Sequence, residues 1–134
     1  MIVAKRWSLL AVMVGLLWST FAVPVRAEVK DYEFQLVQNE VKKGDSAMVA
    51  VRLVNKRSGK TVSDAVISAK RIDMAPDGMA AMAAPLEQLP STEPGTYRFK
   101  ASLMMEGRWQ LSLAAKVQGE TGTVESKLVL KATP

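Results

Sequence analysis

The residues best suited to chemistry in this sequence are methionines. Five of its eight methionines lie in two short segments, Asp73–Met82 and Leu103–Trp109. These five are Met74, Met79, Met82, Met104 and Met105. A thioether is a soft, uncharged ligand for cations such as Cu(I) or Ag(I), and methionine also adapts well to irregular gaps in a core. The two segments therefore predict either a soft-metal site or a flexible hydrophobic plug.

Both segments lie where the backbone is expected to leave a strand. Pro76 with Asp77-Gly78 indicates a turn in the first segment, and Glu106-Gly107 indicates a turn in the second. Met104 and Met105 are adjacent, and adjacent residues of a strand point to opposite faces. Core packing therefore accounts for at most one of the pair.

Trp109 follows the second segment and has two interpretations. Its ring face could cover a bound cation through a cation–π contact. Its alternation with Leu111 and Leu113 instead favours a core anchor at the start of a strand. We expect the anchor.

Other kinds of site have little support in the sequence. Asp73, Asp77 and Glu106 lack the regular spacing of a calcium loop, and Asp77-Gly78 is more typical of a turn. The chain contains no histidine and no cysteine, which excludes Ser-His-Asp and Cys-His catalysis and histidine-based zinc or blue-copper centres. We assign no catalytic residue and expect a protein that is not an enzyme.

The first 27 residues are typical of a signal peptide. Lys5 and Arg6 form a basic start, Trp7–Val23 is an apolar run, and Val25-Arg26-Ala27 ends in the small-x-small pattern of a cleavage site. The sequence predicts cleavage after Ala27 and a periplasmic protein. The alternative is a retained segment that anchors the protein in the membrane and faces it to the periplasm, since about 17 apolar residues are near the minimum for a bilayer span.

The mature chain would be one domain, residues 28–134. Removal of the leader takes three of the 18 basic residues and none of the 13 acidic ones, which leaves a net charge of +2. The remaining basic residues are scattered among acidic ones and are not collected on one face, and aromatic residues are few, so we expect no nucleic-acid partner. A membrane contact is expected only if the N-terminal segment is retained.

Alternation of apolar and polar residues predicts an all-β domain. Strand patterns occupy Tyr32–Val37, Ala47–Asn55, Val66–Ile72, Tyr97–Leu103, Trp109–Val117 and Val124–Leu130. Val66–Ile72 is expected to be edge-like, and Met79–Ala84 could form one helical turn. About seven short strands with turns between them predict an immunoglobulin-like antiparallel sandwich.

The same patterns predict how the methionine segments are held. The strand ending near Met104 and the strand beginning at Trp109 are expected to form a hairpin beneath the site. The turn after Asp73 reaches that end only if its own strand is a neighbour in the sheet.

The mature chain resembles the YtkA-like/FixH-like family of small exported or membrane-anchored β-sandwich proteins. The resemblance covers Tyr32 to Leu130. It rests on the methionine-rich stretch Met74–Met82, on Pro94–Phe99, and on Met104–Leu111, in that order.

The resemblance implies a function. Members look like accessory proteins of heavy-metal efflux or of copper-oxidase assembly, so it implies periplasmic copper or silver handling. Relatives often carry histidine among the loop methionines, and its absence here favours weak Cu(I) binding or a role in binding another protein. The expected partners are a metal ion, an efflux-system protein or an oxidase-assembly protein.

Overall fold

The computed structural model describes residues 29–134. The expected signal peptide, its cleavage after Ala27 and the alternative of a membrane anchor all concern residues outside this range. Within residues 29–134, no helix has both the length and the apolar character needed to cross a bilayer.

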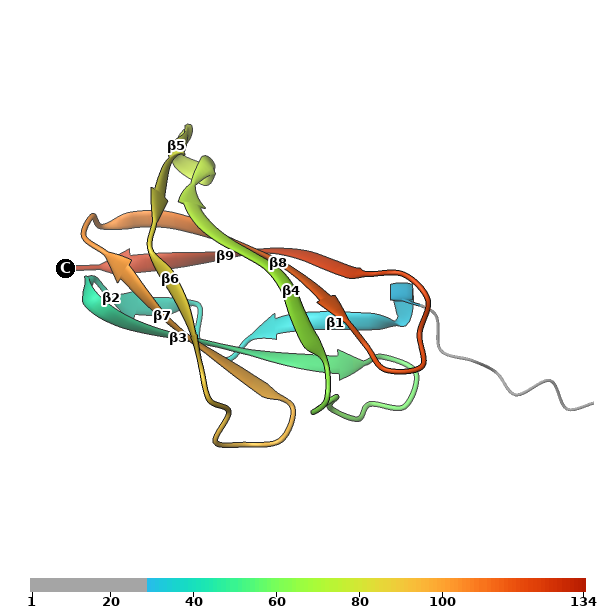
Figure 1. Ribbon diagram of the computed structural model, residues 1–134. Coiled ribbons are helices and arrows are strands. Elements are labelled where there is room, and N and C mark those ends of the chain that lie inside the picture. The colour runs from blue at the N-terminus through green and yellow to red at the C-terminus, as the bar shows by residue number, and fades with distance from the viewer. Residues whose placement is uncertain (1–28) are drawn as a thin grey trace, which may run out of the picture.

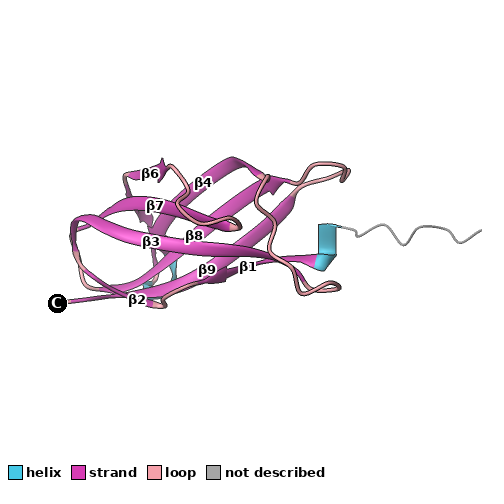
Figure 2. Cartoon of the chain, turned by 90° about the horizontal axis from the view of Figure 1, so that it is seen from below, coloured by secondary structure: helices cyan, strands magenta, loops and turns pink. Residues whose placement is uncertain are grey.

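Two β-sheets pack face to face in this part of the chain (Figures 1 and 2). One sheet has the strand order β1-β3-β7-β6, and the other has the order β2-β9-β8-β4-β5. Two 3₁₀ turns, η1 (Val29–Asp31) and η2 (Ala75–Asp77), complete the described elements. The strands are β1 (Tyr32–Leu36), β2 (Glu40–Lys42), β3 (Gly44–Asn55), β4 (Val66–Met74), β5 (Met79–Ala84), β6 (Leu86–Leu89), β7 (Thr96–Leu103), β8 (Gly107–Lys116) and β9 (Val124–Thr133).

The core lies between the two sheets and follows the alternation in the sequence. In β7 every second residue from Tyr97 to Leu103 is buried, and in β8 the same holds from Trp109 to Ala115. A half-buried strand needs this period because successive side chains point to opposite faces. The core side chains include Phe34, Val49, Val51, Leu53, Ile72, Met74, Phe99, Leu111 and Leu130. The predicted immunoglobulin-like sandwich is confirmed.

The strand count and one pairing differ from the prediction. The described part contains nine strands rather than about seven, because the short strands β2, β5 and β6 lack a clear alternation. β2 pairs with β9 in parallel, whereas the other paired strands are antiparallel. The helical turn expected at Met79–Ala84 was wrong, since that segment is β5. The turn lies just upstream, in η2, where Pro76 fixes the backbone angle φ.

The predicted hairpin of Tyr97–Leu103 with Trp109–Val117 was also wrong. These segments form β7 and β8, which belong to different sheets, so the connection between them crosses the sandwich. The hairpin partner of β8 is β9, as the turn after Val117 indicates. Two strands that pair side by side and two strands that face each other across the core show the same alternation of apolar and polar residues. The alternation therefore could not show that β7 and β8 lie in different sheets.

β4 is an edge strand over only part of its length. It pairs with β8 from Val66 to Asp73, and β5 covers its other side only from Ile72 to Met74. A bulge between Ile67 and Ala69 moves Val66 to the outer face, although simple alternation places it on the same face as Ile72. β4 nevertheless lies next to β8, which is the condition needed for the two methionine segments to meet.

Candidate functional site

Residues of the turn after β4 stabilise its backbone conformation. The Asp73 carboxylate accepts a hydrogen bond from the backbone N–H of Ala75 through Oδ1, at 2.9 Å. Pro76 lies in the first turn of η2, and Gly78 ends it in the left-handed region with φ of 77°. A glycine adopts that conformation without steric cost, so the chain can reverse into β5 at this point.

Arg71 fixes Asp73 and the start of β5. Its Nε donates to Asp73 Oδ2 at 2.9 Å, and its Nη2 donates to the carbonyl of Ala80 at 2.9 Å. Burial of Asp73 acts to raise the pKa of its carboxyl group, but the Ala75 N–H and the Arg71 guanidinium outweigh this and lower the pKa. Asp73 is therefore ionised and bonded on both oxygens at neutral pH.

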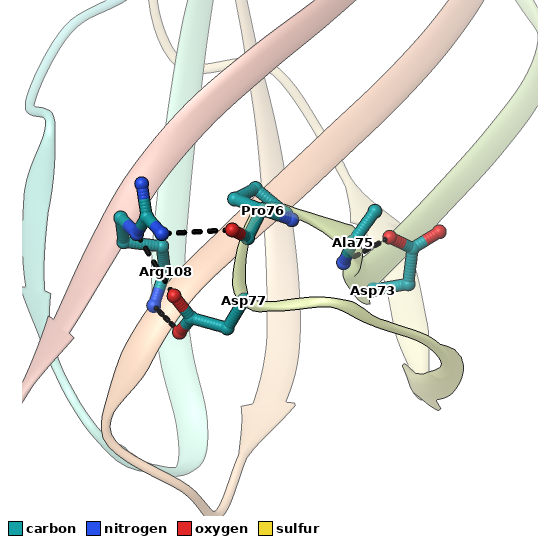
Figure 3. A network of polar contacts seen from close by, with 5 residues as sticks. All are labelled: Asp73, Ala75, Pro76, Asp77 and Arg108. Atoms are coloured by element: carbon teal, nitrogen blue, oxygen red, sulfur yellow. Dashed lines mark hydrogen bonds and ion pairs between the residues drawn. The ribbon is translucent and has the colours of Figure 1, made fainter.

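A second carboxylate joins the turn to β8 (Figure 3). The backbone N–H of Arg108 donates to Asp77 Oδ2 at 2.8 Å, and Arg108 Nε donates to Oδ1 at 2.8 Å. The guanidinium also donates to the carbonyl of Pro76 at 2.8 Å. The backbone N–H and then the side chain of Arg108 lower the pKa of Asp77. Asp77 thus ties η2 to the first residues of β8.

Gly107 makes this close approach possible. A Cβ atom at position 107 would lie 2.7 Å from Asp77 Oδ2 and 2.8 Å from Met74 Cε. The φ angle of Gly107 is 137°, which also disfavours other residues. The first methionine segment therefore packs directly on the start of β8.

The second methionine segment is held to the same strand. Trp109 Nε1 donates to the carbonyl of Met105 at 3.0 Å, and the Trp109 side chain is buried. The prediction that Trp109 is a core anchor is confirmed. A ring enclosed in this way does not form an open lid over the surface.

The five predicted methionines fall into two groups by exposure. Met74 is buried at 1% exposure, and its neighbour in register on β5 is Met79. The other four side chains are exposed, from 36% for Met79 to 61% for Met104. Met104 and Met105 both point away from the core, so core packing explains neither of them. Four thioethers thus remain accessible on two segments that β8 holds at the same end of the sandwich.

The acidic residues of the turn serve as structural links. Asp73 and Asp77 each use both oxygens on N–H donors of the chain, so both carboxylates hold the turn in place at neutral pH. In the described residues, no cluster of three or more histidine, cysteine, aspartate or glutamate side chains could hold a metal.

Sequence reasoning missed the residues that build this arrangement. Gly107 and Arg108 make the contacts between the two segments, and Arg71 holds the first segment together. Gly107 and Arg108 lie in the stretch that carries the family resemblance, but nothing in that stretch predicts these contacts. One of these contacts has a signal in the sequence, which is the spacing Arg71-x-Asp73 at the end of a strand. Residues two apart lie on the same face of a strand, so this spacing predicts the ion pair between Arg71 and Asp73.

Comparison with known protein families shows to which family the chain belongs. A family model described as YtkA-like matches residues 26–114. The chain belongs to the YtkA-like family. No curated protein sequence is similar enough to the chain to count as a match.

Solved structures resemble this YtkA-like domain at low sequence identity. The crystal structure of the Lin-41 filamin domain has a TM-score of 0.47 and 16% identity, and the match covers 81% of this chain and 95% of that one. The ZirS C-terminal domain has a TM-score of 0.43 and 12% identity, with coverage of 78% and 67% respectively.

Proposed function

We propose that this protein is a non-enzymatic periplasmic accessory of heavy-metal homeostasis or efflux that binds Cu(I) or Ag(I) weakly. Its ligands are the exposed methionines Met79, Met82, Met104 and Met105, with Met74 as the buried member of the set. The observation that carries the proposal is the exposure of four thioethers on two segments bonded to the start of β8. The metal-handling role implied by the resemblance to YtkA-like proteins supports the same function.

The chemistry of the donor set explains the choice of ion. Neutral sulfur favours soft monovalent cations over hard cations that seek oxygen. The neighbouring carboxylates are already bonded to N–H groups, so they offer little to a hard ion. Ligands from exposed segments and the absence of histidine favour a weak, open site from which an ion can be passed on.

Competition for Cu(I) against a chromogenic chelator under reducing conditions tests this function. We expect the mature protein to withdraw copper from the chelator, and we expect Met79→Ala combined with Met82→Ala to weaken that competition. Met48→Ala is the matched control, because Met48 is also exposed but lies on β3 in the other sheet. An absence of competition, or equal effects of the two variants, would refute the metal function.

The exposure of β5 favours a second function. Met79–Ala83 is exposed along its whole length, consists only of methionine and alanine, and lies at the edge of its sheet. An exposed apolar edge of this kind is typical of an interface. The alternative is therefore a module that binds an efflux-system or oxidase-assembly protein and holds no metal.

Replacement of sulfur without loss of volume separates the two functions. Leucine at positions 79, 82, 104 and 105 keeps the apolar surface and deletes every exposed thioether of the site. Metal transfer requires the sulfur, so this variant should lose Cu(I) competition. Cross-linking to the partner that survives in the leucine variant, but is lost in Met82→Glu, would favour the interface.

A further inference from the structure

Arg108 of β8 donates three hydrogen bonds to the turn after β4 (Figure 3). Its backbone N–H and its Nε bond the two oxygens of Asp77, each at 2.8 Å, and its Nη2 bonds the carbonyl of Pro76 at 2.8 Å. Hydrogen bonds to a carboxylate are stronger than those between neutral groups, and bonds to both oxygens fix its orientation. We call the contacts of Arg108 with Asp77 and Pro76 the Arg108 clamp.

The clamp lies beyond the point where the pairing of the two strands ends. The last pair in the register of β4 with β8 is Asp73 with Gln110. Both methionine segments continue past that pair, where no strand register joins them. Among residues 29–134, the hydrogen bonds between the two segments all come from Arg108. The clamp therefore sets the position of one segment relative to the other.

Each end of the clamp is close in sequence to an exposed methionine. Asp77 precedes Met79 by two residues, and Arg108 follows Met105 by three. An extended chain spans at most about 3.6 Å per residue, so the Cα atoms of the two pairs are within roughly 7 Å and 11 Å. Connections this short leave little slack, so loosening the clamp must change the separation of the methionines.

The methionines are also ordered within their own segments. Arg71 bonds the carbonyl of Ala80 in β5, and Trp109 bonds the carbonyl of Met105. Neither contact crosses from one segment to the other. Loss of the clamp should therefore separate two segments that each keep their own contacts.

A buried methionine lies between the two segments. Met74 is opposite Met79 in the register of β4 with β5, and its Cε is 2.8 Å from the position of a Cβ atom on Gly107. Gly107 follows Met105 by two residues. Neighbouring residues thus connect Met79, through Met74, to the loop that carries Met105.

We propose that Arg108 is a positioning residue that unites the exposed methionines of both segments into one soft-metal site. The four methionines are Met79, Met82, Met104 and Met105. A guanidinium is cationic and has no acceptor, so Arg108 acts through Asp77 and Pro76 and does not touch the ion. This inference rests on the proposed metal function and adds that the two segments bind one ion together.

The gain from uniting the segments comes from effective concentration. A second pair of ligands held near an ion that the first pair has bound competes at high local concentration, which can raise affinity by about 10²- to 10⁴-fold. If the clamp is lost, each pair binds separately and more weakly. Metal affinity should then depend on a residue that has no contact with the metal.

A titration of the mature protein with Ag(I), followed by NMR of the methionine ε-methyl groups, compares the wild type with Arg108→Gln. Glutamine keeps part of the side chain but has neither the charge nor the fork of donors. In the wild type we expect the four exposed signals to follow one binding curve. In the variant we expect two curves, one for each segment, both with midpoints raised by about tenfold or more.

Two further variants show that the effect passes through the clamp. Asp77→Asn should also split the curves, and the double variant with Arg108→Gln should be little worse than either single one, because both changes remove the same contact. Arg52→Gln is the matched control, since Arg52 is an exposed arginine on β3 in the other sheet. It should bind Ag(I) as the wild type does. A general loss of stability would raise the midpoints without splitting the curves.

The outcomes separate this inference from the proposed function. One shared curve with an unchanged midpoint in both Arg108→Gln and Asp77→Asn would overturn the role of Arg108 and leave the metal function standing. Two curves already present in the wild type would show that the segments bind separately, which also contradicts the inference. If Ag(I) does not bind the wild type at all, the metal function is refuted and the inference with it.

Discussion

Trp109 links the core to the candidate site at the scale of a single residue. Its ring is buried between the sheets while its indole N–H holds the carbonyl of Met105. Truncation to alanine should cost about 3 to 5 kcal/mol of unfolding free energy, as for other buried large aromatic residues. Because a small domain has only about 5 to 15 kcal/mol in total, this variant should be close to unfolded in chemical denaturation.

Trp109→Phe is the informative companion of that variant. Phenylalanine keeps much of the buried surface but cannot donate to the Met105 carbonyl. We expect a smaller loss of stability, together with faster amide exchange in residues 104–106. A denaturation midpoint that is unchanged in Trp109→Ala would show that the ring contributes nothing to the core.

Gly107 is the residue at which the first methionine segment meets β8. In Gly107→Ala the new methyl group would contact Asp77 Oδ2 and Met74 Cε at less than 3 Å, so the ends of these two side chains must shift and the Asp77–Arg108 contacts are disturbed. We expect a loss of stability larger than that of Gly59→Ala, measured by urea denaturation. Gly59 also has a positive φ angle, of 71°, but nothing lies near its missing Cβ. Equal losses in the two variants would mean that the backbone angle, and not the contact, restricts position 107.

The turn between β4 and β5 should respond to acid at the scale of the element. The pKa values of Asp73 and Asp77 are lowered in the folded protein, so both carboxylates bind protons less readily there than in the unfolded chain. The stability they provide is fully present above the unfolded pKa, about 3.9, and is lost as the pH falls through the lower folded values. The free energy of unfolding should therefore decline below about pH 4.

Asp77→Asn isolates one of these contributions. The variant should be less stable than the wild type at pH 7, and its stability should fall less steeply between pH 4 and pH 2. Glu106→Gln serves as the control, because Glu106 is an exposed acid beside the same turn. A pH dependence in Asp77→Asn that matches the wild type would show that Arg108 does not lower the pKa of Asp77.

The strands could be predicted from sequence because each half-buried strand carries a period of two. Val49, Val51 and Leu53, for example, are all buried as their alternation indicates. Sheet membership could not be predicted, since β7 and β8 alternate in the same way although they lie in opposite sheets. The bulge at Ile67 and Ala69 leaves no pattern either, because one extra residue changes the phase without changing composition.

At the scale of the whole molecule, the sequence nominated the methionines of the candidate site but did not predict how their segments are held. The methionines stood out because five of the eight lie in two short segments that also contain turn residues. Their division into one buried and four exposed side chains depends on the neighbours of each strand. The arginine contacts to Asp73 and Asp77 depend on pairs that are 2 and 31 residues apart, and polar pairs have no periodic signal.

The central claim is that the exposed methionines at this end of the sandwich bind a soft metal. Titration with Ag(I), followed by NMR of the methionine ε-methyl groups, tests it most directly. We expect the signals of Met79, Met82, Met104 and Met105 to shift together and saturate, while the signal of Met48 does not change. If Met48 shifts with the same midpoint, or if none of the four signals moves, the metal site is contradicted.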